Sequence, residues 1–107
     1  MFAVHFIMSF VGGALLCNSI PHLTAGLRGE LFPSPFAKPR GIAPSAPEHN
    51  VLWGALNLFI GLAFIHRHVA WAGFVPGFVL CGWFLARYFG RVRAAGFQAG
   101  AGQPGRL

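Results

Sequence analysis

The feature that most constrains this chain is a long apolar stretch, residues 51–86, with a single full charge at Arg67. As one helix it would be about 54 Å long at 1.5 Å per residue, far more than the roughly 30 Å hydrocarbon layer of a bilayer. A charge at the bilayer centre costs at least about 2.5 kcal/mol, whereas at a water interface it costs almost nothing. The stretch therefore predicts a transmembrane helical hairpin, residues 51–65 and 69–88, that turns at Arg67.

The overall composition supports lipid as the solvent of the chain. Hydrophobic residues make up 55% of the sequence and charged residues only 9%, whereas a soluble domain typically has about 25% charged residues. So few charges cannot cover the surface of a small domain. A net charge of +6 is also found in proteins that bind nucleic acid. Here the basic residues are scattered beside apolar runs, which argues against a nucleic-acid partner.

The N-terminal region predicts the first of three transmembrane helices, over residues 2–20, because no charged side chain precedes Arg28. No Lys or Arg precedes the apolar run and no A-x-A site follows it, so we expect a retained helix rather than a signal peptide. Pro21 is expected to mark its end, since the residue before a proline is pushed out of helical geometry. The predicted fold is an all-α membrane protein whose three-helix domain covers residues 1–92.

Small residues at helical spacing predict close packing of the three helices. The predicted packing positions are Ser9, Gly13 and Cys17 in the first helix, Gly54 and Gly61 in the second, and Gly73 and Gly77 in the third. Cys17 and Cys81 both lie in apolar segments and in the same half of the membrane. We expect them to be reduced packing residues that could be neighbours.

Two segments lie outside the predicted helices. Residues 24–50 contain five prolines, so they cannot cross lipid exposed and are expected to form an ordered, irregular interfacial loop with one short helical turn near residues 25–32. A mobile connector is the alternative. The tail, residues 93–107, is expected to be mobile because it has little to bury.

The basic residues also predict an orientation. Of the eight Lys and Arg residues, only Arg67 lies on the side of the N-terminus, so the positive-inside rule places the long loop and the C-terminus in the cytoplasm. Arg87, Arg91 and Arg93, at the end of the third helix, are expected to contact anionic lipid.

Polar residues at membrane depth or at its boundary are the candidate site residues: Asn18, His22, Asn50 and Asn57. Asn57 is expected to face another helix, either as an interhelical contact or as a ligand group. Asn50 is expected to be the N-cap of the second helix, whose positive end suits Glu48.

The histidines suggest one cofactor hypothesis. His5 and His22 are separated by the same number of residues as His49 and His66, so antiparallel helices could present a histidine pair at each interface. Such pairs could hold heme or a metal, or serve proton transfer near a quinone. Histidine is also at home at a membrane boundary, and we favour that interpretation, with no cofactor. We expect no catalytic set and no metal site.

A further pattern runs from Asn18 to Gly61. It consists of N-x-x-P-H at residues 18–22, S-P-F-x-K-P at residues 34–39 and N-V-L-W-G at residues 50–54. It resembles small uncharacterised bacterial multi-pass membrane proteins. The resemblance implies a bacterial inner membrane and brings no activity, cofactor or catalytic residue.

Three functional hypotheses follow. The leading one is a non-enzymatic accessory subunit of a membrane complex, or a homo-oligomer, because small-residue stripes suit packing against other helices. The second is a small oligomeric transporter or channel lined by Asn18, Ser19, Asn57 and the paired histidines. The third is a heme- or quinone-linked redox subunit, which depends on the histidine pairs.

Overall fold

A computed structural model describes residues 1–99 of the chain, with side chains for residues 1–96. This part contains helices α1 (Phe2–Leu27), α2 (Pro47–Ile65) and α3 (Trp71–Ala99), and strands β1 (Phe32–Pro33) and β2 (Pro44–Ser45). All three helices are long and apolar enough to cross a membrane. The predicted all-helical class with three candidate spans is therefore confirmed, and the fold is compatible with a multi-pass membrane protein.

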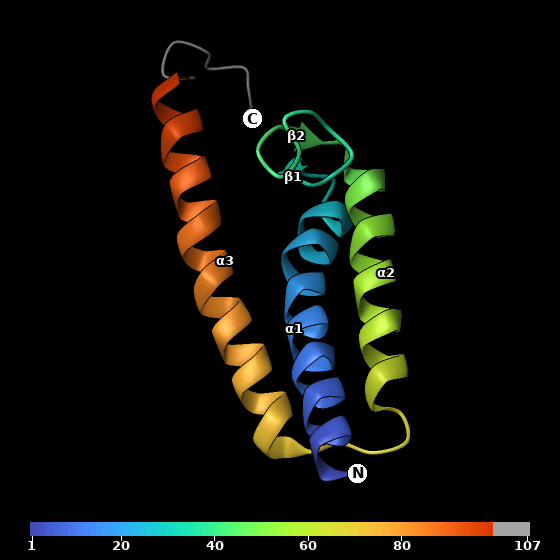
Figure 1. Cartoon of the computed structure of the whole chain (residues 1–107). Helices are drawn as coiled ribbons and strands as arrows, with labels where there is room; N and C mark the ends of the chain where they lie inside the picture. Colours follow the sequence, from blue (N-terminus) through green and yellow to red (C-terminus); the bar gives the residue numbers. More distant parts are fainter. Residues whose placement is uncertain (100–107) are drawn as a thin grey trace.

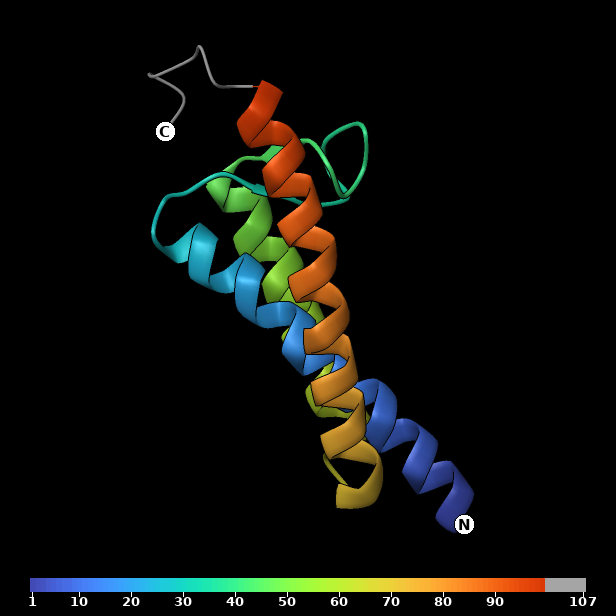
Figure 2. The same cartoon turned by 90° about the vertical axis from the view of Figure 1, so that its left-hand side faces the viewer.

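Helix α1 lies between the other two helices and packs against both (Figure 1). Helix α2 runs antiparallel to α1, whereas α3 runs parallel to it and leans away toward the end that carries the strands. Seen from the side, α1 crosses α3 obliquely (Figure 2). The N-terminus and the turn around Arg67 therefore share one end of the molecule, and the strands and the C-terminal end of α3 share the other.

Most of the buried residues are small or polar, whereas many of the exposed residues are large and apolar. Ser9, Ser19 and Asn50 are among the most deeply buried side chains, whereas Phe59 and Trp83 are largely exposed. This distribution is the reverse of that in a soluble domain. It suits lipid, where helices associate through small residues and hydrogen bonds because lipid tails are as apolar as leucine.

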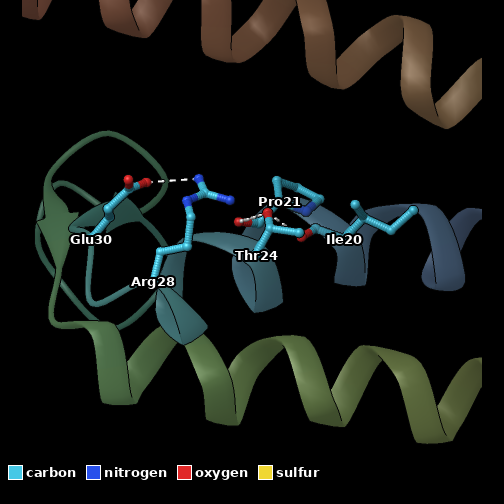
Figure 3. Close-up of polar contacts among 5 residues, drawn as sticks. All are labelled: Ile20, Pro21, Thr24, Arg28 and Glu30. Atoms are coloured by element: carbon cyan, nitrogen blue, oxygen red, sulfur yellow. Dashed lines mark hydrogen bonds and ion pairs between the residues drawn. The ribbon is translucent and has the colours of Figure 1, made fainter.

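Helix α1 does not end at Pro21, as predicted, but continues to Leu27. Proline is tolerated inside membrane helices, and Pro21 removes only the one backbone hydrogen bond to the carbonyl four residues before it. Thr24 Oγ1 donates to the carbonyl of Ile20 at 2.7 Å and to that of Pro21 at 3.2 Å. Figure 3 shows these bonds within the last turns of α1. The expected helical turn near residues 25–32 is therefore partly the end of α1.

The predicted bounds of the other two helices also need correction. Helix α2 begins at Pro47, because proline suits the first helical position, and its N-cap is Ala46 rather than Asn50. Helix α3 begins at Trp71 rather than at residue 69 and extends past residue 88 to Ala99. Good helix formers such as arginine and alanine carry it beyond the apolar stretch. Residues 93–99 of the predicted mobile tail are helical, and residues 100–107 lie outside the described part.

The segment between α1 and α2 contains a small hairpin that the sequence analysis missed. Phe32 and Pro33 pair antiparallel with Ser45 and Pro44. The Tyr88 hydroxyl donates to the carbonyl of Gly41 at 3.0 Å, which ties the hairpin to α3. The hairpin thereby lies over the ends of α1 and α2 and beside α3 (Figure 1). Its depth in a membrane stays a prediction.

Candidate functional site

The candidate site is a buried polar cluster at the junction of α1, α2 and the hairpin. His22 Nδ1 lies 2.8 Å from Asn50 Oδ1. Asn50 Nδ2 donates to three backbone carbonyls, those of Phe32 at 2.9 Å, Ala46 at 3.2 Å and Ser45 at 3.3 Å. His22 reaches this position because α1 continues past the proline, and Asn50 because α2 begins one turn earlier than predicted. Two of the four predicted polar residues thus form one site.

The neighbours of Asn50 determine where the protons of the cluster lie. Carbonyl oxygens only accept hydrogen bonds, so the atom among the three carbonyls is the amide nitrogen and the atom facing His22 is the amide oxygen. That oxygen also accepts only, and His22 Nδ1 must therefore carry a hydrogen. In the neutral ring the lone pair is then on Nε2. This atom gives the cluster whatever base or ligand chemistry it has.

Aromatic rings enclose the imidazole of His22. The rings of Phe32, Phe89 and Trp53 meet it edge-on, with centroids 5.4, 6.1 and 6.5 Å away. They come from β1, α3 and α2, so rings from three elements surround the histidine. The ring is held in one orientation and is almost completely buried. This arrangement is typical of a structural junction.

A second buried contact between hydroxyls supports the hairpin. Ser34 and Ser45 hydrogen-bond to each other through their side chains, and the Ser34 hydroxyl also accepts from the amide of Phe36 at 3.2 Å. Neither serine was predicted as a site residue, although Ser34 is the first residue of the S-P-F-x-K-P pattern. A serine on each side of a proline-rich segment is the only sequence signal for this pair.

The other two predicted polar residues form an interhelical hydrogen bond. Asn18 Nδ2 donates to Asn57 Oδ1 at 3.0 Å, and Asn57 Nδ2 donates to the carbonyl of Trp53 at 2.8 Å. The predicted partner of Asn57 on another helix is therefore Asn18. Both ends of the Asn57 amide are engaged, which favours the interhelical-contact interpretation over that of a ligand group.

The histidines at the N-terminal end do not pair as predicted. The ring of His5 lies 4.4 Å from that of His68, centroid to centroid, and His66 Nδ1 instead contacts the carbonyl of Ala63 at 2.9 Å. The chain reverses just after His66, and the reversal carries His68 rather than His66 back toward α1.

At the other end, His22 and His49 also have separate partners. His22 bonds to Asn50, and the ring of His49 packs against Phe36 at 5.3 Å. Among the side chains of residues 1–96, no group of three or more His, Cys, Asp or Glu could hold a metal ion. In the described residues the histidine neighbours thus differ from the pairs that the heme and quinone hypothesis assumed, and that hypothesis stays a prediction.

The predicted glycines pack where a side chain would collide with a neighbouring helix. A Cβ at Gly73 would lie 2.5 Å from the carbonyl oxygen of Phe6, and one at Gly77 would overlap that of Phe10. A Cβ at Gly13 would overlap the carbonyl oxygen of Phe74. The GxxxG motif of α3 thus brings its backbone against that of α1.

The remaining small residues join α1 to both neighbours. Gly54 packs on Leu23 and Gly61 on Gly12, so the doublet Gly12-Gly13 serves two helices, a role that the spacing rule did not reveal. Ser9 is more than a packing residue, because its hydroxyl accepts the amide of Ala70 at 2.9 Å, just before α3.

The two cysteines are free and lie beside each other, Cys17 on α1 and Cys81 on α3.

Comparison of the chain with protein-family models, curated proteins and solved structures finds no match in any of the three. The resemblance to bacterial membrane proteins therefore stays a prediction. The function has to be argued from the geometry.

Proposed function

We propose that this chain is a non-catalytic accessory subunit that presents one ridge of α3 to another membrane protein. The ridge consists of Trp71, Val75, Val79 and Trp83, which follow one another at a spacing of four residues and so lie on one side of the helix. The two tryptophans are 65% and 69% exposed. This ridge is the observation that carries the proposal, because large aromatic side chains are the residues that most often anchor protein interfaces.

The rest of α3 supports an outward-facing role for this ridge. Gly73, Gly77 and Cys81 follow a second spacing of four and pack against α1. Helix α3 shares no extensive contact with α2, so within the described part of the chain α1 is the helix that holds it, together with the hairpin contacts of Tyr88 and Phe89. One side of α3 is therefore internal and the opposite side is free for a partner.

The polar groups support association rather than chemistry or transport. His22 and Asn50 are enclosed by the hairpin and three aromatic rings, and Asn18 and Asn57 bond to each other. A transport pathway along Asn18 and Asn57 would have to break their hydrogen bond. In an accessory subunit these side chains have a structural role, because their hydrogen bonds hold the helices in one arrangement.

We also propose a bacterial inner membrane, with the hairpin and the C-terminal end of α3 in the cytoplasm. Arg67 lies at the end with the N-terminus, and the basic residues of the hairpin and of α3 lie at the other end, which agrees with the positive-inside rule. Fusions at the C-terminus test this orientation. We expect a C-terminal fusion to green fluorescent protein to be fluorescent and a C-terminal fusion to alkaline phosphatase to be inactive. A dark first fusion with an active second one would invert the topology.

Affinity purification of the full chain from its native membranes in mild detergent tests the accessory role. We expect a stoichiometric membrane protein, or a second copy of the chain, to copurify. Trp83→Ala should lower the amount of copurified partner about tenfold or more, as expected for a side chain that anchors an interface. Leu56→Ala on α2, also exposed, is the matched control and should leave it unchanged. A wild-type chain that purifies as a monomer without a partner would refute the proposal.

A further inference from the structure

An apolar groove of about 280 Å³ separates α1 from α3 near the hairpin end. Helix α1 lines it with Cys17, Ile20 and Pro21, and α3 lines it with Gly82, Leu85 and Ala86. Gly82 and Ala86 are the smallest residues in this lining, and α3 leans away from α1 in this region (Figure 1). Phe32 and Phe89, whose rings lie 4.7 Å apart, line its end nearest the hairpin. The groove is separate from the ridge proposed for a partner protein.

Cationic side chains lie just beyond this end of the groove. Arg93 follows Leu85 and Phe89 at a spacing of four residues, so it lies on the same side of α3 as the groove. Arg28 follows the last residue of α1. In Figure 3 its guanidinium extends from the same side of α1 as the Pro21 ring, toward α3.

Arg28, Glu30 and Arg93 form one charged group. Arg28 donates to Glu30 at 2.7 Å, and both side chains are more than half exposed. The hydrogen bond from Arg28 lowers the pKa of the Glu30 carboxyl, and the positive charges of Arg28 and Arg93 lower it further. Arg93, on the groove side of α3, thus acts electrostatically on the same carboxyl as Arg28. With two arginines and one glutamate, the group has a net charge of +1 at neutral pH.

We propose that the groove binds one acyl chain of an anionic phospholipid whose phosphate contacts Arg28 and Arg93. Gly82 and Arg93 are about 16 Å apart along α3, at 1.5 Å per residue, which is close to half of the roughly 30 Å hydrocarbon layer. A chain lying in the groove thus places its phosphate at the arginines. The complementary charge favours an anionic headgroup over a zwitterionic one.

The size of the groove excludes a helix as its occupant. A helix with its side chains is about 10 Å across, and the groove is slightly smaller than the roughly 300–1,000 Å³ of typical ligand pockets. A single hydrocarbon chain fits these limits. Arg87 and Arg91 follow Trp83 along the opposite ridge of α3, so they take no part in this site.

The test reconstitutes the full chain in vesicles of equal parts phosphatidylglycerol and phosphatidylcholine, releases it into mild detergent and measures retained lipid by native mass spectrometry. We expect one retained phosphatidylglycerol. Arg93→Gln should lower its retention about fivefold, Glu30→Gln should raise it, and Arg87→Gln, the matched control, should leave it unchanged.

A groove-filling variant tests the acyl-chain part of the proposal. Ala86→Trp should abolish retention with all charges kept, whereas Leu80→Trp, at an exposed position of the same helix, should not. Circular dichroism of each variant shows whether it is folded. Equal retention of both lipids, equal effects of Arg93→Gln and Arg87→Gln, or full retention in folded Ala86→Trp would overturn the proposal.

Discussion

His22 on α1 and Asn50 on α2 meet through a buried hydrogen bond of 2.8 Å, although 28 residues separate them in the chain. The Asn50 amide nitrogen also donates to three backbone carbonyls near the start of α2, so one side chain connects α1, α2 and the hairpin. Buried polar groups are costly when a partner is lost. Loss of this buried contact should therefore destabilise the fold more than loss of an exposed hydrogen bond.

Asn50→Ala should lower the free energy of unfolding by about 2–3 kcal/mol, because it leaves the buried His22 donor without its acceptor and removes the side-chain hydrogen bonds to three backbone carbonyls. Unfolding in mixed micelles of dodecylmaltoside and dodecyl sulfate measures this loss. Leu52→Ala, an exposed position of the same helix, is the control and should change stability by less than about 0.5 kcal/mol. Equal effects of the two variants would show that the cluster does not hold the fold.

Gly77→Ala should destabilise the contact of α3 with α1 by about 1–3 kcal/mol, because its Cβ would overlap the carbonyl oxygen of Phe10. Gly90→Ala on the same helix meets nothing within 4 Å and should be neutral or stabilising by up to about 1 kcal/mol. The same unfolding titration compares them. A neutral Gly77→Ala variant would contradict the close packing of the two backbones.

A double-mutant cycle with Asn18→Leu and Asn57→Leu should give a coupling energy of about 0.6 kcal/mol, and no more than about 1.7 kcal/mol, as for other hydrogen bonds between membrane helices. The two single variants and the double variant are compared by unfolding titration. Strictly additive effects would mean that the two amides do not interact.

Glu30 should titrate below the ordinary pKa of a glutamate, and its carbon NMR signal in detergent micelles reports the value. Arg28→Gln should raise that pKa because the hydrogen bond is lost, Arg93→Gln should raise it less, and Arg87→Gln should not change it. A lowered folded-state pKa stabilises the fold above the unfolded-state pKa, and this contribution is lost as the pH falls through the folded-state value. The pair is exposed, so we expect no measurable change in stability across this range.

Much of the architecture could be predicted from the sequence. The apolar stretches and the lone Arg67 indicated three candidate spans and a turn, and the spacing of Gly73 and Gly77 indicated close packing. The polar character of Asn57 indicated a partner on another helix. These features could be predicted because solvent preference and helical periodicity act over short stretches of chain.

The helix ends and the site depended on contacts between distant residues. Pro21 predicted a boundary, but α1 continues past it, and only the packed structure places His22 beside Asn50 and His5 beside His68. The hairpin of Phe32 and Ser45 likewise has no local pattern that indicates pairing.

The sequence by itself thus determined that this chain has three helices suited to lipid, because too few charges are present to solvate their surfaces. The tertiary structure decided which polar groups meet. A buried donor has to find an acceptor, and the acceptor that it finds depends on how helices distant in the sequence pack against one another.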